Sequence, residues 1–444
     1  MKALAPLLFW VLSLLSSTPL LSQNWEEQAK STLPPGYGIF SMSIVDENIV
    51  WAVAYDITGG SPVPSNHVTL VLKTLNGGRS WSVNNVTEAT GRISFDIVAF
   101  DSTTAFITTQ DFNSGRGRGV FKTSDGGDTW VEKFRDVSGG VWIRFFDRQE
   151  GIVINRQLIA KTFDGGETWQ AISNQNFPTF QSDESTIIGT GNNSCEVVGD
   201  HIWFGTDKGR IYRSKDRGNT WEAFRTSLGS DALILSVAFK DTLNGIISNS
   251  ATLPSTLATT KDGGETWTTR ASFPLLPIRN LEFVPNTDST LVATSGLTQS
   301  RNRLLAFSTD FGGRWQLFNN LLPFGSIAFI SPTVGWVANP RVFLLGETVM
   351  YKWNSNLFTT SNEDPVSSFG KIYPNPFSED LHVSSLGQVT SFRLLSIDGK
   401  LIQSQNLEIN EERISFQHLQ PGAYILELIM DDGTSFSERI FKVD

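Results

Sequence analysis

The sequence is poor in the residues that build metal centres and disulfide frameworks. Its 444 residues include one cysteine, Cys195, and four histidines, which are His67, His201, His382 and His418. A single cysteine forms no disulfide within its own chain, and the histidines are scattered without metal-ligand spacing. We therefore expect no disulfide framework, no cysteine-based zinc site and no metal or other cofactor.

Positive charge is also scarce, and long helical patterns are absent. Lysine and arginine number 35 against 45 aspartates and glutamates, which gives a formal net charge of −10. Such an acidic chain is poorly suited to a nucleic-acid backbone or an anionic membrane, so we expect no nucleic-acid partner. The 38 glycines, 31 phenylalanines and 13 tryptophans instead favour many short strands joined by tight turns.

One long apolar run is present, at the start of the chain. Met1 and Lys2 precede an uncharged, mostly apolar stretch from Ala3 to Leu21. This pattern predicts a secretory signal peptide over residues 1–22. A membrane anchor is the alternative, because the run is almost long enough to span a bilayer. The prolines and serines within the run favour cleavage.

A motif of the form Ser/Thr-x-Asp-x-Gly-x-Thr-Trp occurs in six close copies, and the first copy has asparagine in place of aspartate. The Asp or Asn can accept backbone hydrogen bonds, glycine supplies a positive φ, and Thr-Trp favours return into a strand. Each copy therefore predicts a hairpin turn with a structural carboxylate, pinned by its tryptophan. A catalytic or metal-binding aspartate is the alternative, but active sites are usually single. The residues are Asn76, Trp81, Asp125, Trp130, Asp164, Trp169, Asp216, Trp221, Asp262, Trp267, Asp310 and Trp315.

These copies resemble the Asp-box, or BNR, repeat of sialidases and related β-propellers, over residues 24–353. The resemblance implies that each box lies on the turn between the third and fourth strands of a blade, away from the ligand-binding face. Successive box tryptophans are 39 to 52 residues apart, which suits four-stranded blades.

Seven second strands can be counted, so we predict an all-β chain with a seven-bladed β-propeller over residues 23–353. The seventh unit ends at Tyr351–Trp353 without a box. Asn24–Gln28 looks like a fourth strand that has no hairpin before it. We expect this N-terminal strand to complete the seventh blade and close the ring.

The end of the chain differs from the repeats in composition and periodicity. Residues 354–369 are polar and lack periodicity, which predicts a linker. Residues 370–444 contain short strands separated by Asp-Gly and Pro-Gly turns, which predict a small immunoglobulin-like antiparallel β-sandwich.

This last domain resembles the type A C-terminal sorting domain of the type IX secretion system of Bacteroidetes. The resemblance implies Sec export, recognition by the type IX machinery, and either release or attachment to the outer-membrane surface. An ordinary accessory sandwich is the alternative. The residues that carry the resemblance are Tyr373, Pro374, Asn375, Pro376, Phe377, Gly399, Gly422 and Tyr424.

A binding site is expected on the face opposite the boxes, where loops between second and third strands meet the links between blades. Arginines occur there, or near the channel, in an otherwise acidic protein. We predict an anion-binding mouth in which guanidinium groups bind carboxylates, with solvated loops as the alternative. The candidates are Arg92, Arg116, Arg118, Arg144, Arg279, Arg301 and Arg303.

No complete catalytic set can be identified, so we expect a secreted or surface binding and adhesion protein, with a glycan or protein ligand, rather than an enzyme. A glycoside hydrolase of the sialidase type is one alternative. That chemistry needs an arginine triad, a Tyr/Glu nucleophile pair and an acidic aspartate, and the sequence has no Arg-Ile-Pro motif. A scaffold is the other alternative, because the blades also resemble those of the photosystem II stability/assembly factor.

Overall fold

The structure is a computed structural model of the whole chain, which divides into two compact units. The first unit ends at Thr359 and the second starts at Thr360, inside the segment for which the sequence predicts a linker. No helix among the described residues is long and apolar enough to cross a bilayer. The predicted signal peptide lies outside the described residues, which are 25–56, 67–111, 118–136, 140–155, 159–172, 177–186, 194–249, 255–273, 278–295, 304–318, 325–339, 349–355, 358, 371–373, 377–384, 389–396, 400–407, 413–430 and 435–443.

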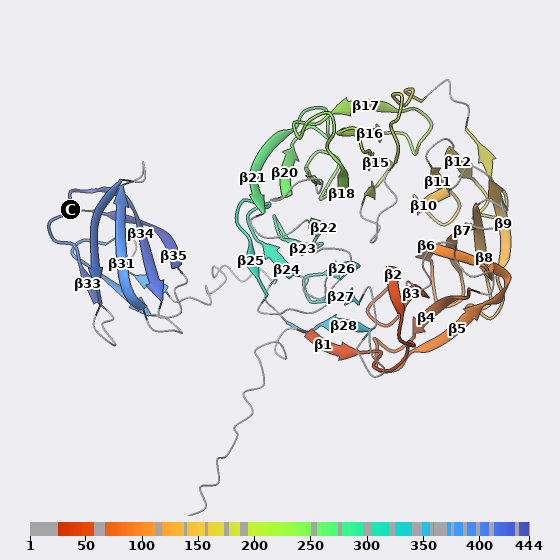
Figure 1. Cartoon of the computed structure of the whole chain (residues 1–444), viewed down its shortest axis with the longest axis horizontal. Coiled ribbons are helices and arrows are strands. Elements are labelled where there is room, and N and C mark those ends of the chain that lie inside the picture. Colours follow the sequence, from red (N-terminus) through yellow and green to blue (C-terminus); the bar gives the residue numbers. More distant parts are fainter. Residues whose placement is uncertain are drawn as a thin grey trace, which may run out of the picture. The chain divides into compact units, whose positions relative to one another are not determined.

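The described part of the first unit contains seven antiparallel sheets of four strands, arranged as the blades of a ring (Figure 1). A 3-10 helix, η2 (Thr87–Ala89), follows the first blade. The strands of blades 1 to 3 are β2 (Tyr37–Ile44), β3 (Val50–Asp56), β4 (Thr69–Thr74) and β5 (Ser82–Val86); β6 (Arg92–Ala99), β7 (Ala105–Asp111), β8 (Arg118–Thr123) and β9 (Val131–Asp136); and β10 (Gly140–Phe145), β11 (Gly151–Asn155), β12 (Ile159–Thr162) and β13 (Gln170–Ala171).

Blades 4 to 6 repeat this arrangement, and blade 7 combines the two ends of the propeller sequence. The strands are β14 (Cys195–Val198), β15 (His201–Gly205), β16 (Arg210–Ser214) and β17 (Glu222–Arg225); β18 (Ile234–Phe239), β19 (Gly245–Asn249), β20 (Ser255–Thr260) and β21 (Thr268–Phe273); β22 (Ile278–Phe283), β23 (Leu291–Ser295), β24 (Leu304–Ser308) and β25 (Gln316–Leu317); and β26 (Ile327–Ser331), β27 (Val334–Ala338), β28 (Met350–Trp353) and β1 (Trp25–Gln28).

The first strand of each blade lines the centre of the ring. These strands contact one another in the order β2, β6, β10, β14, β18, β22 and β26, and β26 contacts β2 again. The side chains of one blade pack on the next because each sheet has an apolar face on either side. The all-β propeller predicted from the repeats is therefore confirmed, and its innermost strands surround the centre of the ring (Figure 1).

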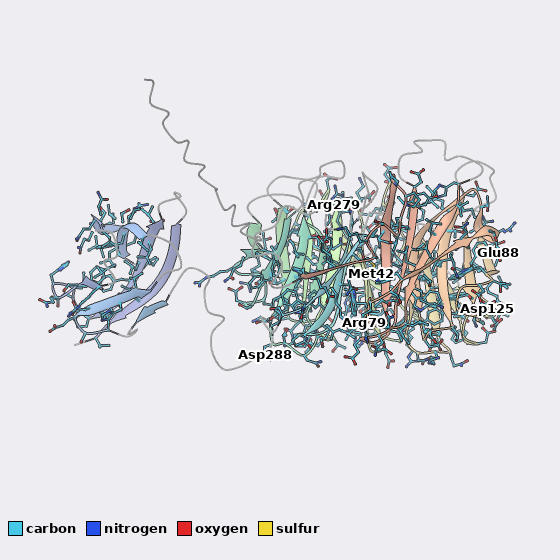
Figure 2. All side chains as sticks on the ribbon, turned by 90° about the horizontal axis from the view of Figure 1, so that it is seen from below. Met42, Arg79, Glu88, Asp125, Arg279 and Asp288 are labelled. Atoms are coloured by element: carbon cyan, nitrogen blue, oxygen red, sulfur yellow. The ribbon has the colours of Figure 1, made fainter. Side chains whose placement is uncertain are left out.

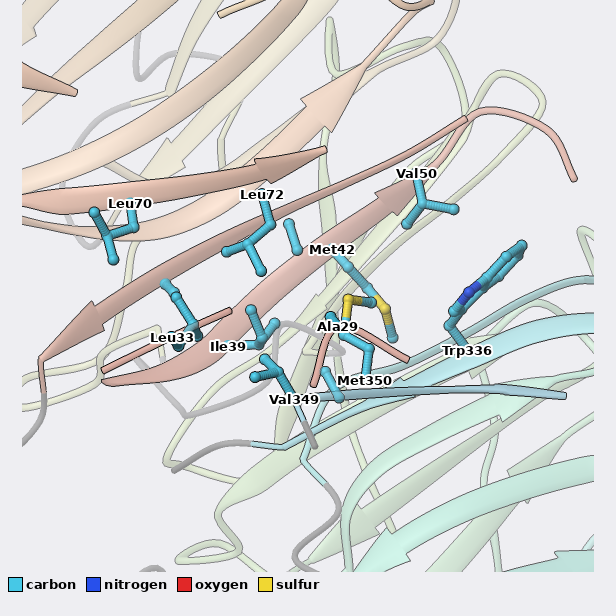
Figure 3. Packing of buried hydrophobic residues seen from close by; sticks show 13 residues of the cluster. Ala29, Leu33, Ile39, Met42, Val50, Leu70, Leu72, Trp336, Val349 and Met350 are labelled. Atoms are coloured by element: carbon cyan, nitrogen blue, oxygen red, sulfur yellow. The ribbon is translucent and has the colours of Figure 1, made fainter. Parts of the chain in front are cut away.

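The ring is closed by the N-terminal strand, as the sequence predicts. Strand β1 pairs antiparallel with β28, and Trp25 lies opposite Trp353. A shared cluster packs blade 7 against blade 1: Figure 3 shows Met42 of β2 beside Trp336 of β27 and Met350 of β28. The two ends of the propeller sequence thus join through both hydrogen bonds and core packing.

Each Asp-box is a turn built around its carboxylate or amide. In blade 2 the hydroxyl of Thr123 donates to Asp125 at 2.8 Å, and Thr129 donates to Asp125 from its backbone N–H at 3.0 Å and its hydroxyl at 2.6 Å. The backbone at Gly126 and Gly127 has φ of 85° and 92°, a region that a Cβ disfavours. The aspartate thus accepts three hydrogen bonds within its own turn, as the structural interpretation of the box expects.

A cation on the third strand links most blades to the next box, a feature that the sequence analysis missed. Lys73 donates to the carbonyl of Gly126 at 2.5 Å, and Lys122 donates to that of Gly165 at 2.8 Å. In blades 1 to 4 the cation stands one residue before the box Ser or Thr, and in blade 7, which has no box, Lys352 occupies the corresponding place on the third strand. The remaining members are Arg213 with Gly263, Lys352 with Gly77, and Lys161 with the side chain of Asn219.

The second unit is a small two-layer β-structure. One sheet has the order β29-β30-β33 and the other β32-β31-β34-β35, and a common core of buried side chains that includes Phe377, Phe392 and Leu426 joins them. Residues 374–376 and Gly399 of the sorting motif lie outside the described residues. The strands are β29 (Lys371–Tyr373), β30 (Asp380–Ser384), β31 (Val389–Ser396), β32 (Leu401–Asn406), β33 (Arg413–Ser415), β34 (Gly422–Met430) and β35 (Ser435–Lys442).

Ring closure can be tested on one buried and one exposed residue of β1. Trp25 is 4% exposed and its ring lies 4.9 Å from that of Trp353, whereas Glu27 on the same strand is exposed. Trp25→Ala should lower the free energy of unfolding by about 3–5 kcal/mol, as for other buried aromatic truncations. The matched control Glu27→Ala should change it by less than about 0.5 kcal/mol. Urea denaturation measures both, and equal effects would contradict this account of closure.

The Asp-boxes should make stability sensitive to acid. Hydrogen bonds from Thr168 lower the pKa of Asp164 from its ordinary 3.8 to about 2. A depressed pKa stabilises the fold fully above pH 4, and this contribution is lost as the pH falls through 2. Asp164→Asn should fold, because blade 1 already uses Asn76, whose amide donates to Ser80 at 2.8 Å.

The difference in unfolding free energy between wild type and Asp164→Asn should therefore shrink between pH 5 and pH 2. Denaturant titrations at several pH values measure it. A difference that stays constant over this range would show that Asp164 does not carry the stabilising charge.

Candidate functional site

Four of the seven arginines predicted to bind anions have no described side chain. Arg116, Arg301 and Arg303 lie outside the described residues, and Arg118 belongs to β8 without a described side chain. Arg279 is described: it lies toward one face of the propeller, whereas Asp125 and Asp288 lie toward the other (Figure 2). Arg279 therefore stands on the face opposite the boxes, and burial lowers its pKa.

Arg92 is enclosed within blade 2. Its side chain is 5% exposed, and its Nη1 lies 2.8 Å from Oε1 of Glu132 on the fourth strand. The same nitrogen donates to the hydroxyl of Thr109 at 3.4 Å. The guanidinium is thus engaged by an internal carboxylate, so this arginine ties strands together and does not offer an open fork to an anion.

Arg144 joins three blades at the channel. Its Nη1 lies 2.5 Å from the Asp96 carboxylate on β6, and its Nε and Nη2 donate to the carbonyl of Cys195 on β14 at 3.3 and 3.2 Å. Asp96 also accepts a hydrogen bond from Ser41 on β2 at 3.0 Å. Burial alone would lower the pKa of Arg144, but the charge of Asp96 outweighs it and raises that pKa.

Arg92 and Arg144 therefore lie in separate ion pairs, and the structure does not bring them together into one anion site. The sequence could not show this, because Glu132 and Asp96 lie far along the chain from their partners. For the arginines outside the described side chains, the anion-binding mouth stays a prediction.

A cavity of about 840 Å³ opens beside Arg144 in the channel. Its lining includes Glu196 of β14 and Glu282 of β22, together with Phe239, Phe329 and, at its Asp-box end, Asp288. A volume of this size falls within the range of ligand pockets. The cavity is thus a concave site among the described residues at the centre of the first unit.

The two glutamates are the functional candidates that sequence reasoning missed. Burial raises the pKa of Glu196 to about 7, although the nearby charge of Arg144 lowers it in part. Burial also raises the pKa of Glu282 well above its ordinary value, and the charge of Glu196 adds to this effect. The available signal was a single acidic residue inside each of two otherwise mainly apolar inner strands.

These carboxylates have few internal partners. Glu282 accepts a hydrogen bond from the backbone N–H of Phe329 at 2.7 Å. Among the described residues, the carboxylate of Glu196 has no hydrogen bond and no ion pair within 4 Å. Within the same residues, no group of three or more His, Cys, Asp or Glu side chains could hold a metal ion. The two carboxyl groups can therefore accept hydrogen bonds from a ligand and attract a positively charged group.

Comparisons with known proteins agree with the two-unit structure. Residues 371–442 match the family of the secretion system C-terminal sorting domain, and residues 108–227 match the photosynthesis system II assembly factor YCF48 family. No curated protein matches the chain.

Solved structures similar to this chain include propellers of two functional kinds. YCF48 bound to D1 peptide has 18% identity and a TM-score of 0.52, over 74% of this chain and 96% of that one. YCF48 from Cyanidioschyzon merolae has 16% identity and a TM-score of 0.54, over 74% and 99%. A GH74 xyloglucanase from Xanthomonas campestris has 10% identity and a TM-score of 0.49, over 95% and 74%.

Identities this low show the fold alone. Together, the repeats, the closed ring and the matched C-terminal domain define the architecture and the route of export. The chain is a BNR-repeat β-propeller with a C-terminal sorting domain, exported by type IX secretion to the cell surface or the extracellular space.

Proposed function

We propose that this exported propeller is a binding protein whose ligand enters the central channel and leaves it chemically unchanged. The observation that carries the proposal is the 840 Å³ cavity, in which Glu196 and Glu282 face the space with few internal partners. Polar groups that remain unsatisfied in the folded protein are ready to bind a ligand. A propeller of similar fold has been solved with a bound peptide, which supports a peptide as one class of ligand.

Sialidase chemistry has little support among the described residues. Arg92 and Arg144 are held by Glu132 and Asp96 in different blades. Tyr212 is fully buried on the third strand of blade 4, where its hydroxyl donates to Glu184 at 3.2 Å. That tyrosine packs inside a blade and does not face the channel cavity.

A glycoside hydrolase of another type is the second candidate function. Two carboxyl groups with raised pKa values line one cavity, and glycosidases use a pair of carboxyl groups as acid and as base or nucleophile. The two candidates differ in one observable, which is whether the bound molecule is cleaved.

The full-length secreted protein should retain ligands from an array of glycans and extracellular peptides, and mass spectrometry should find the retained molecules intact. Glu282→Gln should weaken retention, whereas the exposed control Glu27→Gln should leave it unchanged. Cleavage products that vanish in Glu282→Gln would overturn the non-catalytic proposal in favour of the hydrolase.

Export can be tested at the boundary between the two units. Removing residues 360–444 leaves every strand of the propeller intact. We expect the truncated protein to accumulate in the periplasm of a type IX-competent host, because the sorting domain is missing. Fractionation and protease accessibility of intact cells measure this outcome. Surface exposure of the truncated protein at the wild-type level would contradict sorting through the C-terminal domain.

A further inference from the structure

The channel cavity contains more negative charge than its surroundings compensate. Its charged lining residues are Arg144, Lys240, Glu196, Glu282 and Asp288. Arg144 is already neutralised by Asp96, which stands behind it on β6. Lys240 is exposed and donates to the backbone carbonyl of Asp288 at the mouth. Among the described lining residues, Glu196 and Glu282 therefore share the cavity only with cations that are already engaged elsewhere, although the charge of Arg144 still acts on Glu196.

Elsewhere in the propeller, buried cations form ion pairs with carboxylates that compensate their charge. Arg213 is 1% exposed and lies 2.7 Å from Glu222 and 2.9 Å from Glu265. Lys161 is 2% exposed and lies 2.7 Å from Glu150. Burying a carboxylate without such a partner is unfavourable, because the charge loses its hydration. Glu196 and Glu282 are only partly exposed in the channel and, among the described residues, have no such ion pair.

The remaining cavity wall is mixed: Asn286 and Thr287 line it together with apolar residues, and its three phenylalanines are only 4–9% exposed because they pack between blades. Phe239, Phe283 and Phe329 come from three successive blades, and Ala238 and Val284 fill the spaces beside them. An ionised carboxylate accepts hydrogen bonds but donates none, so this wall offers acceptors and apolar contacts. A ligand that suits it has an aliphatic part and a donor group with positive charge at its end.

We propose that the cavity binds a primary ammonium group on an aliphatic stem, as in a lysine side chain or a free diamine, between Glu196 and Glu282; this inference rests on the proposed binding function. The ammonium supplies three donors to the two carboxylates, and the methylene groups contact the apolar atoms of the lining, such as those of Ala238 and Val284. A carboxylate ligand is disfavoured, because it would meet like charge.

The proposal predicts a specific dependence on pH. Protonation of the glutamates removes the charges that hold the ammonium, while the amine itself stays charged up to about pH 10. Since burial raises the pKa of Glu196 to about 7, affinity should increase as the pH rises through 7. The charge of Arg144 opposes the rise in the pKa of Glu196, and burial also raises the pKa of Glu282. The other charged groups around the two glutamates are Asp96, Lys240 and Asp288.

Isothermal titration calorimetry on the full-length protein tests the inference with two probes: 1,5-diaminopentane, and the peptide Gly-Gly-Lys-Gly-Gly with its ends blocked. We expect binding at pH 8 that weakens at least tenfold at pH 5, with proton release seen as a difference between two buffers. Binding of the diamine alone would assign the site to small amines, and binding of the peptide alone would assign it to lysine side chains. The peptide with an acetylated lysine should not bind.

Two glutamine variants locate the site. Glu196→Gln and Glu282→Gln should each weaken binding at least tenfold at pH 8, and the control Glu27→Gln should not. Both variants should melt at or above the wild-type temperature, because each removes a poorly compensated buried acid, so lost binding cannot be attributed to unfolding. Equal binding by wild type and both variants would overturn the inference.

The outcome also separates this inference from the proposed function. If neither amine binds but the glycan and peptide array yields another ligand lost in Glu282→Gln, the ammonium assignment fails and the channel-binding function stands. If neither experiment yields a ligand, both fail.

Discussion

The propeller depends on one recurring contact, in which a cation crosses from one blade to the Asp-box of the next. Lys73, Lys122 and Arg213 each reach the carbonyl of a box glycine in the following blade. The tight box turn places that carbonyl within reach because its glycines adopt positive φ. The box is therefore more than a hairpin turn: it is the acceptor half of the joint between blades. Lys352 reaches Gly77 in the same way, so the joint that closes the ring has the chemistry of the internal joints although its partners are 275 residues apart.

Most of the exceptions follow from the same constraint. Blade 7 has no box, and blade 6 correspondingly has Phe307 at the cation position; blade 5 has Thr259 there, although blade 6 carries a box. In blade 4 Arg217 occupies the position of the first box glycine with a φ of 58°, and Lys161 turns to the side chain of Asn219. Arg217 in turn contacts Asp147 and Asp200 at 2.6 Å, so a second cation replaces the missing carbonyl contact. The repeat thus tolerates substitution where another charge can bridge the same two blades.

How well the sequence predicts a feature depends on how far apart along the chain its residues lie. The boxes and the sorting motif are local, so their residues identify the turns, the blades and the export domain. The Trp25 strand was predictable because the seventh unit lacks a fourth strand. Arg92 and Arg144 were expected to bind external anions because Glu132 and Asp96, 40 and 48 residues away, become their partners only when blade 2 folds and when blade 3 packs on it, respectively. Glu196 and Glu282 escaped notice for the same reason, since the ring must close before two blades can present them to one cavity.

The partly or fully buried charges of the described residues therefore fall into two groups, which differ in whether the architecture accounts for them. Arg144 with Asp96, and Arg213 with Glu222 and Glu265, are paired across strands or blades, and the architecture itself accounts for them. Glu196 and Glu282 make no comparable pair within the described residues, and burial opposes the ionised form of each. Apolar residues would pack at both positions, because the inner strands β10 and β18 of other blades carry the buried residues Ile143 and Ala238. Two acids that fold stability alone does not require, and that share one cavity, are therefore the residues on which the proposed binding function rests.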